Sequence, residues 1–154
     1  MDVRQRLSAA LKDAMKAREA DRLSTLRLIN AAIKDRDIAL RGTGAEEGAT
    51  VSEGDVLAIL GRMVKQRQES ARAYEEGGRL ELAEKELSEI KVIEEFLPRQ
   101  LSEDEAAAAV EAAIAETEAA SLRDMGRVMA VLKDKYTGQM DFGRVGPMVK
   151  NKLG

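Results

Sequence analysis

The sequence predicts an all-α protein, and three observations support this prediction. Apolar residues recur at intervals of three and four along most of the 154-residue chain, which is the pattern of amphipathic helices. No stretch alternates apolar and polar residues as a half-buried strand would, and no hairpin signature joins two such stretches. Capping residues, glycines and a proline divide the pattern into segments of helical length. We therefore expect four helices before Pro98 and three after it.

The first 41 residues predict two helices. In the first, from residue 2 to about 18, one face is formed by Val3, Leu7, Leu11 and Met15. Asp21 is expected to cap the second helix, which continues to about Arg41. Its apolar stripe contains Leu23, Leu26, Ile29, Ile33 and Leu40. The glycine-rich segment 42–51 has no periodicity, so we expect a loop there.

The third and fourth helices follow from longer apolar patterns. Ser52 with Asp55 three residues later predicts an N-cap, and the helix behind it should end at Gly77 and Gly78. Its inward residues are expected to be Val56, Leu60, Met63, Val64, Ala71 and Tyr74. The fourth helix should run from about residue 79 to residue 97. Its inward residues are expected to be Leu82, Ala83, Leu87, Ile90, Ile93 and Leu97.

Pro98 predicts the boundary between a helical domain of residues 1–97 and a second domain of residues 98–154. Proline cannot continue the preceding helix, and it pushes Leu97 away from helical geometry. Ser102 and Glu105 then form a capping-box pattern that starts a fifth, alanine-rich helix. The second domain is expected to hold three helices.

Residues 122–154 predict the last two helices. The sixth has its apolar stripe at Met125, Val128, Met129, Leu132 and Tyr136. Gly126 would permit the close approach of another helix beside this stripe, and Gly138 would stop the sixth helix. Asp141 would cap the seventh helix, unless Pro147 requires that helix to begin near Gly146. Its inward residues would be Val145, Met148, Val149 and Leu153.

The composition removes many kinds of catalytic site. Histidine and cysteine are absent, which excludes disulfides, thiolate nucleophiles, Cys/His zinc sites and a histidine base. The sequence has no glycine-rich phosphate loop and no G-x-S-x-G serine. Carboxylates alone could bind magnesium or calcium, but we interpret acidic pairs such as Glu94–Glu95 as solvated surface. We therefore predict no catalytic residue, no cofactor and no metal.

The N-terminus is charged and no run of eighteen apolar residues occurs. We therefore expect a cytoplasmic protein without a membrane span.

Residues 119–154 carry seven basic and three acidic side chains, whereas the whole chain carries a net charge of −3. Arg123 and Arg127, about one turn apart, fall opposite the apolar stripe of the sixth helix. Such cations suit phosphate contacts that are insensitive to base sequence. The predicted nucleic-acid-binding residues are Arg123, Arg127, Lys133, Lys135, Lys150 and Lys152. The alternative is a solvated basic surface without a ligand. The first 41 residues hold ten basic and six acidic side chains, and the same alternative applies to their excess of positive charge.

Three segments of the chain together resemble the GatB/YqeY family, and specifically its small stand-alone YqeY-like members. They are residues 22–38, 65–105 and 123–138, the last reading RDMGRVMAVLKDKYTG. The resemblance implies a four-helix N-terminal part and a three-helix C-terminal part of the GatB/YqeY type. The C-terminal part is similar to the tail domain of the B subunit of tRNA-dependent amidotransferase. In that enzyme the tail domain reaches the tRNA, and the chemistry lies in other domains and subunits.

The resemblance implies a non-catalytic module that binds tRNA or a tRNA-linked protein, with amidotransferase or aminoacylation components as partners. One alternative is a component of carbon–nitrogen ligase activity with glutamine as amido-N-donor, although none of that catalytic apparatus can be placed on this sequence. Another alternative is a helical protein–protein adaptor. The segment 139–143 and Pro147 depart from the family pattern.

Overall fold

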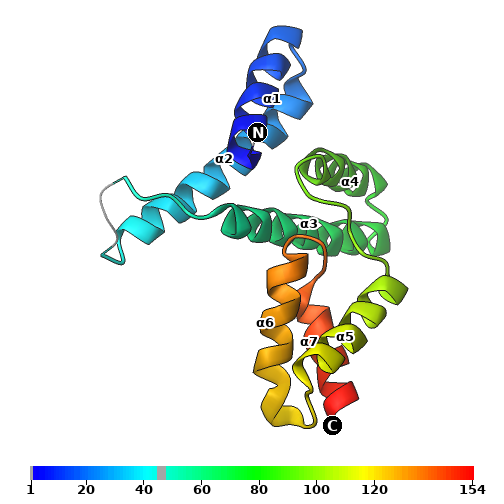
Figure 1. Ribbon diagram of the computed structural model, residues 1–154. Coiled ribbons are helices and arrows are strands. Elements are labelled where there is room, and N and C mark those ends of the chain that lie inside the picture. The colour runs from blue at the N-terminus through cyan, green and yellow to red at the C-terminus, as the bar shows by residue number, and fades with distance from the viewer. Residues whose placement is uncertain (1, 45–47) are drawn as a thin grey trace. The chain divides into compact units, whose positions relative to one another are not determined.

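The computed structural model describes residues 2–44 and 48–154, which form seven α-helices, one short 3₁₀ helix and no strand (Figure 1). The predicted all-α class is confirmed. The chain divides into two compact units, of which the first ends at Leu97 and the second begins at Pro98. We call them the N-terminal unit and the C-terminal unit and describe each by itself. No helix of the described residues is long and apolar enough to cross a membrane.

The N-terminal unit contains α1 (Val3–Ala17), α2 (Ala20–Arg41), α3 (Glu53–Glu76) and α4 (Leu80–Glu94). Helices α3 and α4 pack side by side and are joined by a turn at Gly77 and Gly78 (Figure 1). Gly78 has a φ of 73°, a conformation that glycine adopts at low cost. The core is aliphatic, and its fully buried members include Leu26, Ile29, Val56, Leu60 and Ile93.

Local signals at the predicted helix starts are partly confirmed. The Ser52 hydroxyl accepts a hydrogen bond from the Asp55 N–H at 3.1 Å, as an N-cap should. Asp21, in contrast, is not the cap of α2, because that helix already begins at Ala20. Arg18 takes a left-handed conformation and ends α1 at about the predicted position, and α2 follows directly after Glu19. Asp21 lies in the first turn of α2, where a carboxylate interacts favourably with the helix dipole.

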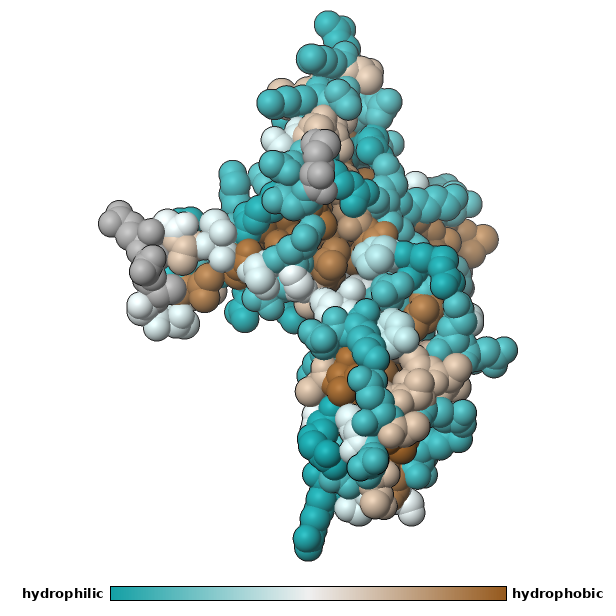
Figure 2. Space-filling model, in the orientation of Figure 1, coloured by the Kyte–Doolittle hydropathy of each residue, from teal (hydrophilic) through white to brown (hydrophobic). Residues whose placement is uncertain are grey.

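Three apolar residues predicted to face inward are exposed instead. Met15 is 57% exposed because a strict four-residue repeat drifts by about 40° per step, and Ala14 takes the inward position. Leu82 and Leu87 are 37% and 42% exposed, because the buried side of α4 is formed by Ala83, Ile90 and Ile93. Helix α4 also ends at Glu94, three residues before the predicted end. Hydrophilic residues cover most of the face visible in Figure 2.

The C-terminal unit contains α5 (Glu103–Thr117), the 3₁₀ helix η1 (Leu122–Asp124), α6 (Met125–Tyr136) and α7 (Phe142–Leu153). The predicted capping box at Ser102 and Glu105 is confirmed, with both hydrogen bonds at 3.1 Å. The core of this unit is built mainly from the apolar faces of these helices. Its buried members are Ala106, Ala109, Val110, Ala113, Val128, Leu132, Met140, Val145 and Val149.

The structure overturns the expectation for Gly126 and decides between the two predicted starts of α7. Gly126 is exposed, and a methyl group there would meet nothing within 4 Å, so it does not serve close helix packing. Helix α7 begins at Phe142, with the Asp141 carboxylate accepting the Gly143 N–H at 2.9 Å, and not near Gly146. Pro147 therefore lies inside α7 and leaves the Gly143 carbonyl without a helical donor. Gly143 is exposed, so water can satisfy that carbonyl.

Candidate nucleic-acid interface

The candidate interface is the basic surface of the C-terminal unit. Arg127, Lys133 and Lys135 lie on α6, and Lys150 and Lys152 lie on α7. Arg123 lies in η1 and not on α6 itself, so the two arginines are not consecutive turns of one α-helix as predicted. All six side chains are exposed.

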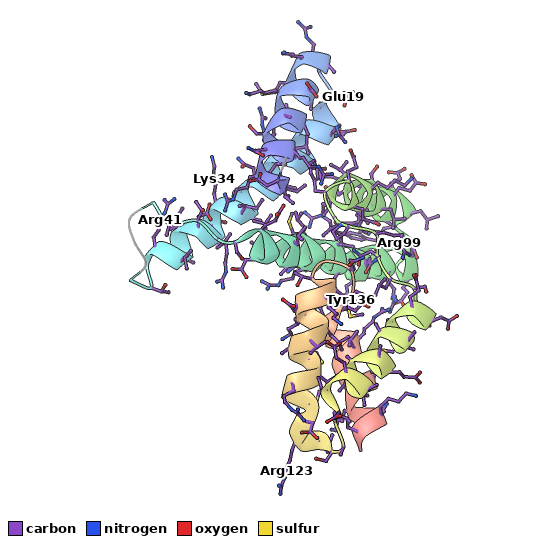
Figure 3. The ribbon with its side chains drawn as sticks, in the orientation of Figure 1. Glu19, Lys34, Arg41, Arg99, Arg123 and Tyr136 are labelled. Carbon is purple, nitrogen blue, oxygen red and sulfur yellow. The ribbon has the colours of Figure 1, made fainter. Side chains whose placement is uncertain are left out.

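The 3₁₀ helix η1 and the C-terminal end of α7 bring most of these cations to one end of the unit. Leu122 lies beside the C-terminal end of α7, because a methyl group built on Gly154 would be 3.8 Å from a Leu122 methyl. Figure 3 shows Arg123 extending from this end of the unit, with Tyr136 near the other end of α6. We call Arg123, Arg127, Lys150 and Lys152 the basic end.

Lys133 and Lys135 lie away from the basic end. They are at the C-terminal turn of α6, roughly 15 Å along the helix from Arg123 at 1.5 Å per residue. Steps of two residues turn a helix by about 200°, so these two lysines also leave α6 in different directions. The six predicted residues therefore do not form a single cluster.

Arg127 is engaged in holding the connection between α5 and α6. Its guanidinium donates to the Asp124 carboxylate at 2.7 Å and to the Thr117 carbonyl at 3.1 Å. Asp124 also accepts the N–H groups of Ala120 and Ser121, at 2.9 and 3.2 Å. The Ala120 N–H, then Arg127 and the Ser121 N–H, lower the pKa of Asp124 to about 2. Arg127 therefore orders this connection, whatever else it binds.

Two lysines are paired with acids of α5. Lys135 Nζ lies 2.6 Å from Glu116, and Lys152 Nζ lies 2.9 Å from Glu111. The hydrogen bond to Glu116 raises the pKa of Lys135. The four side chains are between 50% and 64% exposed, so water and salt screen both pairs. A polyanion could displace such carboxylates at little cost.

The other three cations have no such partner. Within residues 2–44 and 48–154, no carboxylate lies within 4.0 Å of Arg123, Lys133 or Lys150. The helical pattern found the exposed face but missed the pairing of Lys135 and Lys152, because Glu116 and Glu111 belong to a different helix. The strongly acidic composition of α5 was the available signal.

The N-terminal unit offers a small cavity of about 170 Å³ beside the start of α1, lined in part by Val3, Arg4 and Glu53. Two of its charged side chains are already bonded, because Arg4 pairs with Asp37 at 2.7 Å and Glu53 accepts the Val3 N–H at 3.1 Å. Over the described part of the chain, no three acidic side chains gather as a metal site would require. Neither feature provides a catalytic arrangement.

Two curated relatives cover part of the chain. The sequence is 32% identical over 92 residues to "Uncharacterized protein C22F3.15" of Schizosaccharomyces pombe, covering 60% of this chain and 69% of that protein. It is 34% identical over 91 residues to "Altered inheritance of mitochondria protein 41, mitochondrial" of Clavispora lusitaniae. That match covers 59% of this chain and only 49% of the relative. Both relatives therefore extend beyond the matched region.

A family model covers nearly the whole chain. The model of YqeY-like proteins matches residues 4–153, which span both units. The resemblance to stand-alone YqeY-like proteins, inferred from residues 22–38, 65–105 and 123–138, is thereby confirmed. The chain belongs to the YqeY-like protein family.

Proposed function

We propose that the protein is a non-catalytic helical module that binds tRNA, with the basic end of its C-terminal unit as the contact surface. The observation that supports this most is the presence of unpaired, exposed cations at one end of the unit. Arg123 and Lys150 have no carboxylate within 4.0 Å among the described residues, and Lys152 is held only by an exposed ion pair. These side chains can bind phosphate without first breaking a buried interaction.

The similarity to the amidotransferase tail domain supports the choice of tRNA as ligand. Contacts of arginine and lysine to phosphates position a nucleic acid without reading its sequence. A tRNA-linked protein, such as an amidotransferase or aminoacylation component, would then be a partner in the same complex.

The cytoplasmic location stays a prediction, which cell fractionation can test. The Clavispora relative is named as mitochondrial.

The direct test is tRNA binding by the full chain across a salt series. If about four phosphate contacts form, affinity should fall roughly a hundredfold between about 50 and 200 mM salt. The variant Arg123→Glu/Lys150→Glu should bind at least tenfold more weakly at the lower salt, and its salt slope should decrease by about 2. Arg127 is left intact, because replacing it would disturb the Asp124 and Thr117 contacts.

A matched control is Lys12→Glu/Lys16→Glu on the exposed side of α1, which makes the same change in net charge. Its binding should stay close to that of the unmodified chain. Equal losses in both variants would show that net charge alone matters and would contradict the assignment of the basic end.

The ligase-component alternative has its own test. If the purified chain hydrolyses glutamine, that alternative is favoured over a non-catalytic module.

A further inference from the structure

Helix α2 carries a row of cations on its exposed face. Arg27, Lys34 and Arg41 follow each other at seven-residue intervals, with Ala31 and Ile38 between them. The resulting spacing of four and three residues places all five on one side of the helix. All five residues are exposed, Ile38 by 62%. Figure 3 labels Lys34 and Arg41 along this helix.

Helix α2 places no free carboxylate three or four residues from these cations, where side chains of one helix meet. Within the described residues, Asp37 is the one acid that lies three or four positions from a cation of the row. Asp37 is only 6% exposed, and its two oxygens accept hydrogen bonds from Arg4 and from the Val51 N–H. It therefore faces the core and is already bonded.

The three cations accordingly keep their charge available. Across residues 2–44 and 48–154, no carboxylate lies within 4.0 Å of Arg27, Lys34 or Arg41. Arg41 donates Nε to the Ala49 carbonyl at 3.0 Å, which leaves both terminal nitrogens of its guanidinium for a ligand. Among the residues that the structure describes, none forms a hydrogen bond with the side chain of Arg27 or Lys34.

Other arginines of the same unit behave differently. Arg4 pairs with Asp37, Arg22 with Glu95 and Arg67 with Glu89, each at 3.0 Å or less. These pairs connect segments distant in the sequence and thus serve the fold. The row on α2 has no such partner among the described residues, so its charge is available to an external anion.

We propose that Arg27, Lys34 and Arg41 form a second RNA-binding surface, on the N-terminal unit, that contacts backbone phosphates. This inference rests on the proposed tRNA binding and adds a surface that lies outside the GatB/YqeY-type tail. At 1.5 Å per residue the row extends about 21 Å, which is long enough to follow several nucleotides of an RNA strand. The small side chain of Ala31 allows the helix backbone to approach the phosphates.

A polyanion fits the row better than an acidic protein surface does. Exposed ion pairs between proteins contribute little, because each is screened and must immobilise two long side chains. Phosphate contacts in addition release counterions condensed on the nucleic acid, so three cations make a substantial contribution. Ile38 is the single large apolar residue of the row, which is too little apolar surface for the buried centre of a protein interface.

The test measures tRNA affinity of the full chain with Arg27→Glu/Lys34→Glu, two residues without a hydrogen bond or ion pair in the described structure. We expect affinity to fall roughly tenfold at low salt and the salt slope to decrease by about 2, with the helical content unchanged. The control Lys12→Glu/Lys16→Glu makes the same charge change in the same unit and should remain within about threefold. Ile38→Ala should leave tRNA affinity unchanged.

The outcomes separate this inference from the proposed function. If the unmodified chain binds tRNA and Arg27→Glu/Lys34→Glu binds like its control, the assignment of the α2 row is wrong. The assignment of the basic end is then unaffected. If Arg27→Glu/Lys34→Glu weakens binding and Arg123→Glu/Lys150→Glu does not, the result supports the α2 row as the RNA-binding surface and contradicts the assignment of the basic end. Absence of tRNA binding by the unmodified chain would overturn both. A loss with Ile38→Ala as large as that with the double variant would contradict a phosphate surface and favour a protein partner.

Discussion

Two ion pairs of the N-terminal unit and two of the C-terminal unit differ in their exposure and in what they do. In the N-terminal unit, Arg67 and Glu89 join α3 to α4 with side chains that are only 15% and 17% exposed, and Asp37 is almost fully buried against Arg4. In the C-terminal unit, the pairs of Lys135 and Lys152 with α5 are at least half exposed. The first kind of pair holds the fold, whereas the second kind can exchange its carboxylate for another anion. The contrast indicates which charges of this protein are structural and which can serve binding.

The largest effect is expected at Asp37. Asp37→Ala removes three hydrogen bonds and leaves the Val51 N–H without its acceptor and the Arg4 guanidinium without its counter-ion. Because a buried group that loses its partner keeps its desolvation penalty, the free energy of unfolding should fall by about 2 kcal/mol. Urea denaturation measures this change.

Asp35→Ala is the matched control, since Asp35 is an exposed aspartate on the same helix. It should change the free energy of unfolding by less than about 0.5 kcal/mol. Similar losses in both variants would show that the Arg4–Asp37 pair has no special structural role.

Acid should act on the C-terminal unit through Asp124. Its pKa is lowered to about 2 in the folded chain, from an ordinary value near 3.8, chiefly by the Ala120 N–H and then by Arg127. Since the folded state binds the proton less readily than the unfolded chain, this contribution is complete above about pH 5 and is lost as the pH falls towards 2. Asp124→Asn should therefore flatten the stability profile between pH 5 and 2, as followed by circular dichroism. An unchanged profile would contradict the prediction.

Local signals allowed much of the fold to be predicted. Three helix starts are marked by capping interactions between residues two or three positions apart, at Ser52 with Asp55, at Ser102 with Glu105 and at Asp141. Because such interactions are local, they can be predicted from the sequence. Burial was less predictable, because whether Leu82 and Leu87 face the core depends on where α4 meets the other helices. Pro147 left the start of α7 open between Asp141 and Gly146, because the sequence does not show that an exposed Gly143 carbonyl tolerates the missing hydrogen bond.

The candidate site shows the same limit. Helical periodicity correctly placed the basic residues on exposed surface, but their partners lie far along the chain. Glu116 is 19 residues from Lys135, and Glu111 is 41 residues from Lys152. No periodic pattern encodes such pairs, because they depend on how α5, α6 and α7 pack. The approach of the C-terminal end of α7 to Leu122, which brings Lys150 and Lys152 towards Arg123, also depends on this packing.

The smallest effect is expected from the exposed acids of α5. Glu111 competes with phosphate for Lys152 of the basic end, and the negative charge of Glu116 repels the same polyanion. Glu111→Gln/Glu116→Gln should therefore raise tRNA affinity about two- to fivefold at low salt, an increase in keeping with weak, screened pairs. The gain should disappear as added salt screens both the acids and the phosphates. Stability should stay the same, which distinguishes these pairs from that of Asp37. A control, Glu84→Gln/Glu94→Gln on the exposed side of α4, changes the net charge equally and should give a smaller gain. An equal gain in both variants would mean that the acids of α5 act only through net charge, and the pairs of the C-terminal unit would then have no specific effect on binding.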